Sequence, residues 1–311
     1  MNILVVRLGA MGDIIHALPA VASLKGIPGA HITWVMDPRW TPLIDGNPDV
    51  DETVTMNRRD WNSVRHCWSR LRSARFDIAV DLQGLLKSAA VIAAAGADRT
   101  IGFDRGQARE SAAALFYSQK ILTKSTHVVD RYIELAMAAG AANLRRSFWL
   151  PSAEAEGSLP KRPFVFCCPL AGWRSKQWPQ EYYRELARRL DEAGYALVVN
   201  GPENARSELE AIPGAQTHFS GIGGLIDATR RASAIVGVDS GPLHLAAALG
   251  KPGVAIFGPT DPARNGPYGG SFTVLRDPGA ITTYKRSEEI HPSMRAIGPQ
   301  AVFEALLPKL A

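Results

Sequence analysis

Short apolar segments that alternate with helical segments, in a pattern that starts twice, constrain the fold more than any other feature of this sequence. In the first half, apolar runs at Ile3–Arg7, His31–Met36 and Phe76–Leu82 alternate with segments of helical periodicity. After the proline-rich stretch Pro151–Pro163 the pattern begins again, with apolar runs at Phe164–Cys168, Ala196–Asn200, Ala234–Val238 and Val254–Phe257. Alternating strands and helices form parallel sheets with crossover helices. The sequence therefore predicts an α/β chain with two Rossmann-like, doubly wound domains that face a central cleft.

The same restart predicts the domain boundaries. We expect an N-terminal domain over residues 1–152, a linker over 153–163 and a C-terminal domain over 164–295. The length of 311 residues agrees with two domains of about 150 residues each. Residues 296–311 predict an amphipathic C-terminal helix.

Composition excludes several classes of protein. Hydrophobic residues make up 46% of the chain and charged residues 21%, which is typical of globular proteins rather than disordered or fibrous ones. The longest small and apolar stretch, Ala89–Ala97, is about half of the ~18 residues that span a bilayer. Arg7 and Asp13 interrupt the N-terminus too early for a signal peptide. The three cysteines form no disulfide framework, so we expect a cytoplasmic protein.

The positive charge of the chain is concentrated in one segment. The net charge is +5, and six arginines fall within one stretch of the first half: Arg58, Arg59, Arg65, Arg70, Arg72 and Arg75. Such a patch predicts either an anionic partner or a solvated helix face. We do not expect nucleic acid as the partner, because no aromatic RNA-binding signature or DNA-binding helix pair accompanies the patch.

The first strand-to-helix turn contains two glycines and a carboxylate. Gly9 and Gly12 allow the backbone to approach a ligand closely, and Asp13 stands where the next helix begins. An aspartate in that place suits helix capping, and it also suits general-base catalysis at the mouth of a cleft. The spacing is neither a dinucleotide fingerprint nor a P-loop.

Two loops of the second half have residues suited to phosphate. Arg174 and Lys176 lie in a glycine-containing loop before a predicted helix, where backbone N–H groups and cations act together on an anion. The alternative is an exposed loop whose tryptophans cover the core. The stretch Asp239-Ser-Gly-Pro-Leu-His244 ends a strand and opens a helix, so its free N–H groups also attract phosphate. His244 is then either a ligand contact or a structural residue.

A metal site is not expected. Asp49 and Asp51 have Asp-x-Asp spacing, but they follow a proline-containing connection and are interpreted as turn and strand-edge acids. The sequence has no Cys/His cluster with zinc spacing.

Several segments together resemble one known family, the ADP-heptose:lipopolysaccharide heptosyltransferases of glycosyltransferase family 9. They occur in the order expected of that family and cover most of the chain: Ile3–Pro19, Asp81–Ser88, Ala108–Glu110 with Leu115–Tyr117, His127–Arg131, Lys176–Pro179 and Val238–Pro262. Asp81–Ser88 and Ala108–Tyr117 are most similar to heptosyltransferase I.

The resemblance implies a GT-B fold and an inverting transfer of L-glycero-D-manno-heptose from ADP-heptose to the Kdo of Kdo2-lipid A, in lipopolysaccharide inner-core synthesis. The fold also implies that the helix predicted over residues 296–311 packs back on the N-terminal domain. ADP-heptose is a substrate, and the resemblance implies no cofactor and no required metal. It further implies a monomer that associates peripherally with the cytoplasmic face of the inner membrane and binds no nucleic acid.

The resemblance also implies roles for particular residues. Asp13 matches the catalytic base, and Lys176 matches the cation that faces the diphosphate. The residues implied in binding the nucleotide sugar are Lys176, Glu203, Asp239, Ser240, Gly241 and His244. The residues implied in binding the acceptor are Gly12, Arg58, Arg59, Arg109 and Arg131. Ala171 and Gly172 depart from the family, which often has hydroxyl residues there, so phosphate contacts in that loop would come from the backbone.

Two alternatives stay open. One is heptosyltransferase II, or another GT-B nucleotide-sugar transferase with a different acceptor. The other is a nucleotide-binding module without catalytic activity, although Asp13 beside a glycine turn argues against it.

Overall fold

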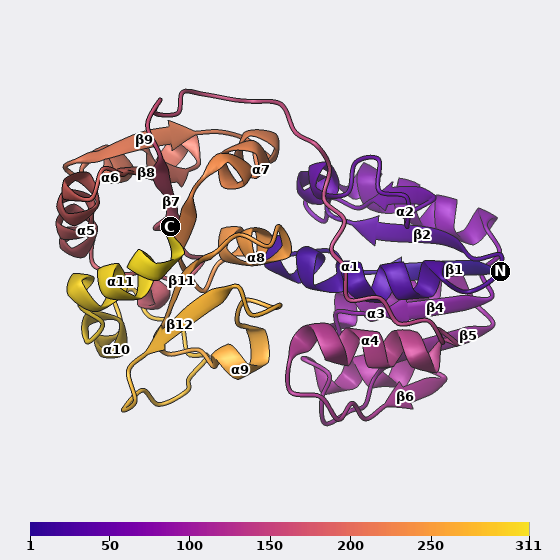
Figure 1. Cartoon of the computed structure of the whole chain (residues 1–311). Coiled ribbons are helices and arrows are strands. Elements are labelled where there is room, and N and C mark those ends of the chain that lie inside the picture. The colour runs from indigo at the N-terminus through magenta and orange to yellow at the C-terminus, as the bar shows by residue number, and fades with distance from the viewer. Residues whose placement is uncertain (311) are drawn as a thin grey trace. The chain divides into compact units, whose positions relative to one another are not determined.

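The structure, a computed structural model, describes residues 1–310 and divides into two compact units, Met1–Pro151 and Ser152–Ala311 (Figure 1). Each unit has one six-stranded sheet in which every pair of neighbouring strands is parallel. The predicted α/β architecture with two doubly wound domains is confirmed. The two units are described separately below.

The first unit has the strand order β3-β2-β1-β4-β5-β6. Its strands are β1 (Asn2–Val6), β2 (His31–Met36), β3 (Glu52–Thr55), β4 (Ile78–Asp81), β5 (Arg99–Phe103) and β6 (Gln119–Ile121). The four apolar residues of β1 from Ile3 to Val6 are completely buried. A continuous apolar run is what a parallel strand covered on both faces requires.

Helices cover both faces of this sheet. Helix α1 (Met11–Lys25) packs beside α4 (Val128–Ala138), and α2 (Trp61–Ser73) packs beside α3 (Leu86–Ala95). Right-handed crossovers place α1 on one face and α2 and α3 on the other, and α4 returns to the face of α1. A 3-10 helix, Ser111–Phe116, packs on α3 before β6 begins.

The second unit repeats this topology with the strand order β12-β11-β10-β7-β8-β9. Its strands are β7 (Phe164–Cys168), β8 (Ala196–Gly201), β9 (Ala215–Phe219), β10 (Ala234–Val238), β11 (Gly253–Phe257) and β12 (Phe272–Arg276). Its helices are α5 (Gln180–Glu192), α6 (Arg206–Glu210), α7 (Ile222–Arg231), α8 (Gly241–Ala248), α9 (Pro262–Asn265), α10 (Pro292–Arg295) and α11 (Pro299–Leu306).

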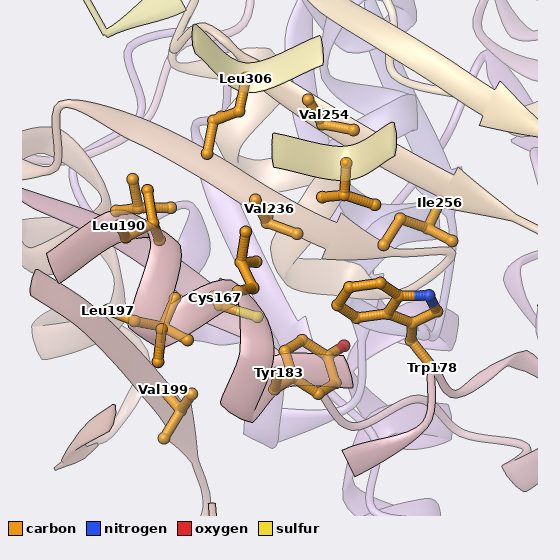
Figure 2. Close-up of a cluster of buried hydrophobic side chains, with 14 of the residues drawn as sticks. Cys167, Trp178, Tyr183, Leu190, Leu197, Val199, Val236, Val254, Ile256 and Leu306 are labelled. Carbon is orange, nitrogen blue, oxygen red and sulfur yellow. The ribbon is translucent and has the colours of Figure 1, made fainter. Parts of the chain in front are cut away.

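The core of the second unit lies between its sheet and the helices α5 and α11. Figure 2 shows apolar side chains of β7, β8, β10 and β11 meeting those of the two helices. Trp178 fills the space beside the sheet, and its ring meets Tyr183 edge-on at a centroid distance of 4.8 Å. The indole Nε1 donates a hydrogen bond of 2.7 Å to the carbonyl of Ile297. Trp178 is therefore a core residue. This agrees with the alternative in which the tryptophans of the Arg174–Lys176 loop cover the core.

Polar edge strands were the elements that the sequence pattern did not predict. The strands β6, β9 and β12 contain residues such as Lys120, Gln216 and Thr273 in place of an apolar run. Each lies at or next to a sheet edge, where one side of the strand has no neighbour to bury it. The central strands β7 and β10 have the bounds that the sequence predicts.

The C-terminal helix is shorter than predicted. Helix α11 ends at Leu306, and a 3-10 turn over Leu307–Lys309 follows it. Its buried residues Val302 and Leu306 face the core of the second unit, and it packs against α5 and β11. The return of the C-terminal segment to the N-terminal domain stays a prediction. Over residues 1–310, no helix combines the length and the apolarity that crossing a membrane takes.

Removal of the Trp178 side chain should destabilise the fold strongly. Trp178 is 1% exposed, so Trp178→Ala leaves a large cavity and an unpaired carbonyl at Ile297. We expect the free energy of unfolding to fall by about 3–5 kcal/mol. Urea unfolding followed by circular dichroism measures this change. Trp61→Ala is the matched control, because Trp61 is 68% exposed and should cost no more than about 0.5 kcal/mol. Equal losses in the two variants would contradict this core assignment.

Candidate active site

The strand order places the candidate site residues. In each sheet the order reverses between two central strands, β1 and β4 in the first unit and β7 and β10 in the second. Ligands of doubly wound sheets bind beyond the carboxyl ends of the strands at such a reversal. Asp13 follows β1, Lys176 follows β7 and Asp239 follows β10. The predicted residues therefore lie at the reversal point of their own sheet.

The turn after β1 is fitted closely to its surroundings. Gly9 has a φ of +144°, and a Cβ atom there would lie 2.5 Å from Nε1 of Trp40, so only glycine suits this position. Helix α1 has Ala10 at its N-cap, and Asp13 lies in the first turn, three residues further on. Asp13 therefore is not the N-cap residue, but its carboxylate accepts a hydrogen bond of 3.2 Å from the Ala10 N–H.

A buried arginine holds the Asp13 carboxylate. The Arg7 side chain is 2% exposed, and its Nη2 lies 2.5 Å from Oδ2 of Asp13. Nη1 of Arg7 donates to the carbonyl of Leu82 at 2.8 Å, and its guanidinium lies over the Tyr132 ring at 5.5 Å. Burial lowers the pKa of Arg7, but the charge of Asp13 opposes burial and the net shift is upward. The pair is thus a fixed ion pair in which Asp13 keeps 32% of its side chain exposed.

Lys87 interacts electrostatically with two of the predicted acceptor arginines of this unit. Lys87 lies in the first turn of α3, and burial lowers its pKa, as do the positive charges of Arg58 and Arg109. The carboxylate of Glu110 acts on the Lys87 pKa in the opposite direction. Arg58 and Arg109 are both exposed, so the group of three is open to an anion in solution.

The turn that leads from β4 into α3, just before Lys87, is held by the buried carboxylate of Asp81. Oδ1 of Asp81 accepts hydrogen bonds from the N–H groups of Gln83 (2.7 Å) and Gly84 (3.1 Å). Its Oδ2 accepts hydrogen bonds from the hydroxyls of Ser88 (2.7 Å) and Tyr117 (2.6 Å). Burial raises the pKa of Asp81, and these hydrogen bonds act against that shift.

The other predicted acceptor residues lie in different surroundings. Arg131 lies in the first turn of α4, where its Nε donates to the Thr123 hydroxyl at 2.9 Å. Its guanidinium also lies over the Phe103 ring, at 4.9 Å from the ring centre. Gly12 is buried in the first turn of α1. Arg59 is exposed, and within residues 1–310 no described side-chain contact joins it to Lys87 or Arg109.

In the second unit, Lys176 and Asp239 form a tight pair. Nζ of Lys176 donates to the Asp239 carbonyl at 2.7 Å and lies 3.1 Å from its Oδ2. The Thr260 hydroxyl donates to Oδ2 at 2.8 Å, and Nε2 of His244 lies 3.6 Å from Oδ1. Burial alone would raise the pKa of Asp239, but His244, Lys176 and Thr260 lower it well below its usual range. Asp239 is therefore ionised and holds three neighbours in place.

The start of α8 has an unused hydroxyl. Ser240 is the N-cap residue and Gly241 follows it, but the Ser240 side chain makes no capping hydrogen bond. Its Oγ is buried and has no hydrogen-bond partner within the part of the chain that the structure describes. A buried hydroxyl of this kind is available to a ligand.

Glu203 is not part of this group. It follows β8, and its side chain is 69% exposed. Both carboxylate oxygens accept hydrogen bonds from Arg206, at 2.7 and 3.0 Å. A ligand that used Glu203 would have to share it with Arg206.

The two aspartates with Asp-x-Asp spacing have structural partners. Asp51 accepts hydrogen bonds of 2.7 Å from the Lys25 ammonium and from the Ile32 N–H, and Asp49 lies 3.3 Å from Arg145. They are turn and strand-edge acids, as predicted. Residues 1–310 contain no group of His, Cys, Asp and Glu side chains arranged to hold a metal ion.

Sequence reasoning assigned no role to three residues of these groups. Arg7 ends the first apolar run, and its burial is known only from the structure. Lys87 and Thr260 lie inside the segments that carry the family resemblance. None of the three has a fixed spacing from Asp13 or Asp239, so only the fold shows that they meet.

Comparison with solved structures identifies the fold class of the chain. The chain superimposes on the E. coli heptosyltransferase WaaC solved with ADP, with a TM-score of 0.78 and 25% identity over 99% of this chain and 100% of that one. The fold is thus of the GT-B type, in which one chain contains two Rossmann-like domains.

The family follows from the sequence. Residues 64–291 match the model of glycosyltransferase family 9 (heptosyltransferase). The lipopolysaccharide heptosyltransferase 1 of Pseudomonas aeruginosa is 30% identical over 87% of this chain and 82% of its own length. The lipopolysaccharide heptosyltransferase 2 of Escherichia coli K12 is 31% identical over 98% and 97%. The chain belongs to glycosyltransferase family 9, the heptosyltransferases.

The ionised state of Asp239 predicts a pH-dependent contribution to stability. Its folded pKa lies below the ordinary value of 3.8, so the contribution is complete above about pH 5 and is lost as the pH falls through the folded pKa. Asp239→Asn should lower the free energy of unfolding by about 3 kcal/mol at neutral pH, because it leaves Lys176 without its carboxylate. The difference from the unsubstituted protein should shrink below about pH 4. Urea unfolding at about pH 7, 5 and 3.5 tests this, and a difference that grows in acid would refute it.

Proposed function

We propose that the chain transfers L-glycero-D-manno-heptose from ADP-heptose to the Kdo of Kdo2-lipid A, in lipopolysaccharide inner-core synthesis. The observation that carries the proposal is the Asp13 carboxylate, which is ion-paired with the buried Arg7, partly exposed, and located after β1 at the reversal point of its sheet. Family membership and the names of the similar proteins support the sugar and the pathway. The resemblance of residues 81–88 and 108–117 to heptosyltransferase I favours Kdo as the acceptor.

Asp13 has the geometry of a general base. Arg7 and the Ala10 N–H both bind its Oδ2, so the carboxylate is oriented and Oδ1 is left to face the acceptor. In the proposed reaction Asp13 takes the proton of the acceptor hydroxyl while that oxygen attacks the anomeric carbon. Attack from the face opposite the diphosphate gives inversion. General-base assistance contributes about 10²–10⁴-fold in rate.

The second unit has donors suited to the leaving diphosphate. As the glycosidic bond breaks, negative charge develops on the phosphate oxygen that leaves. Lys176 lies where the strand order of the second sheet reverses and supplies a positive charge. The free Ser240 hydroxyl and the start of α8 add hydrogen-bond donors. Donors already in place stabilise such charge without reorganisation. We propose that these donors stabilise the diphosphate without a metal ion. Asp239 and His244 would hold Lys176 and the sugar in position.

The cations of the first unit suit the acidic acceptor. Kdo has a carboxylate and lipid A has phosphates, so the acceptor is an anion at a membrane surface. Arg58, Lys87 and Arg109 would bind this anion, and basic groups near an anionic bilayer gain about 1 kcal/mol each. We therefore propose that the chain associates peripherally with the cytoplasmic face of the inner membrane. We also propose that it acts as a monomer.

Heptosyltransferase II activity is the second candidate. It is favoured by similarity to a heptosyltransferase 2 over nearly the whole chain. The two activities differ in the acceptor, which is Kdo-lipid A in one and the heptosylated product in the other. Release of ADP from ADP-heptose, measured with each acceptor and with a chelator present, separates them. If no ADP is released with either acceptor, both activities are refuted. If ADP release requires added metal, metal independence is refuted.

Substitution of the proposed base tests the mechanism. Asp13→Ala should lower kcat at least ~10²-fold with little change in KM for ADP-heptose, because a base acts mainly in the transition state. Steady-state ADP release measures both constants. Asp45→Ala is the matched control, since Asp45 is exposed in the same unit. Normal turnover by Asp13→Ala would rule out the assignment.

Substitution of the cations tests the acceptor site. Lys87→Gln and Arg109→Gln should each raise KM for the acceptor about 10-fold, the effect of losing one hydrogen bond to a charged group. KM for ADP-heptose should stay unchanged. Arg105→Gln serves as the control, because Arg105 is exposed and lies outside the group of three cations. A change in KM for ADP-heptose alone would contradict the assignment of these residues to the acceptor.

A further inference from the structure

A segment without regular structure, residues 277–291, runs from β12 to α10 and is bonded beside the Lys176–Asp239 pair. The N–H of Thr283 donates to the Pro259 carbonyl at 2.7 Å, and Pro259 precedes Thr260, which donates to Asp239. The N–H of His291 donates to the Ser175 carbonyl at 3.3 Å, next to Lys176. The segment is thus attached to both loops that hold the pair.

This attachment brings Arg286 to the loop of Lys176. The guanidinium carbon of Arg286 lies 5.3 Å from the centre of the Trp173 ring, and Nζ of Lys176 lies 4.9 Å from the same centre. The two cationic groups are therefore no more than about 10 Å apart. Trp173 is partly exposed, in contrast to the buried Trp178 of the same loop. Its ring is a platform for the two cations.

Arg286 differs in its partners from the arginines of this unit that form ion pairs. Arg188 and Arg206 each bind two carboxylates. No carboxylate within residues 1–310 is paired with the exposed Arg286 side chain, whose recorded contact is the face of Trp173. An arginine held through an aromatic face keeps its N–H groups for an anion, because stacking leaves the edge of the guanidinium open.

We propose that Arg286 is a further binding residue for the diphosphate of the nucleotide sugar. This inference rests on the proposed function, which places a nucleoside diphosphate beside Lys176. Lys176 is already bound to Asp239, so it offers the diphosphate only part of its charge. Arg286 adds a planar pair of donors that matches two phosphate oxygens. It binds the diphosphate before transfer and stabilises the charge that forms on it as the sugar leaves.

The test compares two neighbouring substitutions in the full chain. Arg286→Gln should weaken ADP binding about 5-fold, the effect of losing a partly exposed ion pair, and should raise KM for ADP-heptose similarly. Lys285→Gln is the matched control, because Lys285 is the adjacent exposed cation, whereas the cations over Trp173 in residues 1–310 are Lys176 and Arg286. Calorimetry with ADP gives the affinities, and thermal unfolding checks that both variants fold. KM for the acceptor should not change.

Each outcome decides the proposal. A loss in Arg286→Gln that is absent in Lys285→Gln supports it. Unchanged affinity in Arg286→Gln overturns it, and Lys176→Met then shows whether ADP still binds at the site of the proposed function. Equal losses in Arg286→Gln and Lys285→Gln indicate a diffuse effect of surface charge and also overturn it. Absence of ADP binding by the unsubstituted chain would refute the nucleotide site and Arg286 together.

Discussion

The reversal of strand order in each sheet is the constraint on which the rest of the structure depends. Where two neighbouring parallel strands send their crossovers to opposite faces, the loops at their carboxyl ends separate and leave polar backbone uncovered. Both sheets have one such point, and both use it for charged side chains. In the first unit these are Asp13 and Lys87, and in the second Lys176 and Asp239. The chemistry of the protein is thus located by topology before any particular side chain is considered.

Buried charge is handled in the same way at both points. Arg7 and Asp239 are almost fully buried, and removing an ion from water costs several kcal/mol unless partners replace the water. Arg7 is bound by Asp13, the Leu82 carbonyl and the Tyr132 ring. Asp239 is bound by Lys176, Thr260 and His244. In each pair one member is buried and its partner is more exposed, so the buried ion fixes the orientation of the more exposed one.

Sequence periodicity predicted the central strands and the two-domain plan because long apolar runs and glycine turns are local signals. It did not predict the polar edge strands, which are stabilised by pairing with a neighbour rather than by their own composition. The positions of Asp13, Lys176 and Asp239 at the ends of central strands could be predicted, since each follows a recognisable strand, and their roles in the reaction stay predictions. The partnership of Arg7 with Asp13 could not be predicted, because nothing local shows that an arginine at a strand end turns inward. Glu203 had the right place after its strand, but the structure pairs it with Arg206.

The Asp81 network ties together residues that are far apart in the chain. Gly102 lies against Tyr117, where a Cβ atom would be 2.3 Å from the ring, and the Tyr117 hydroxyl reaches Asp81 together with Ser88. A larger residue at position 102 would displace the tyrosine, and loss of the tyrosine would leave a buried carboxylate short of a donor. Positions 81, 88, 102 and 117 are therefore structurally coupled. In the evolution of this protein, substitutions at these four positions should occur together, while the residues on the surrounding helix surfaces change independently.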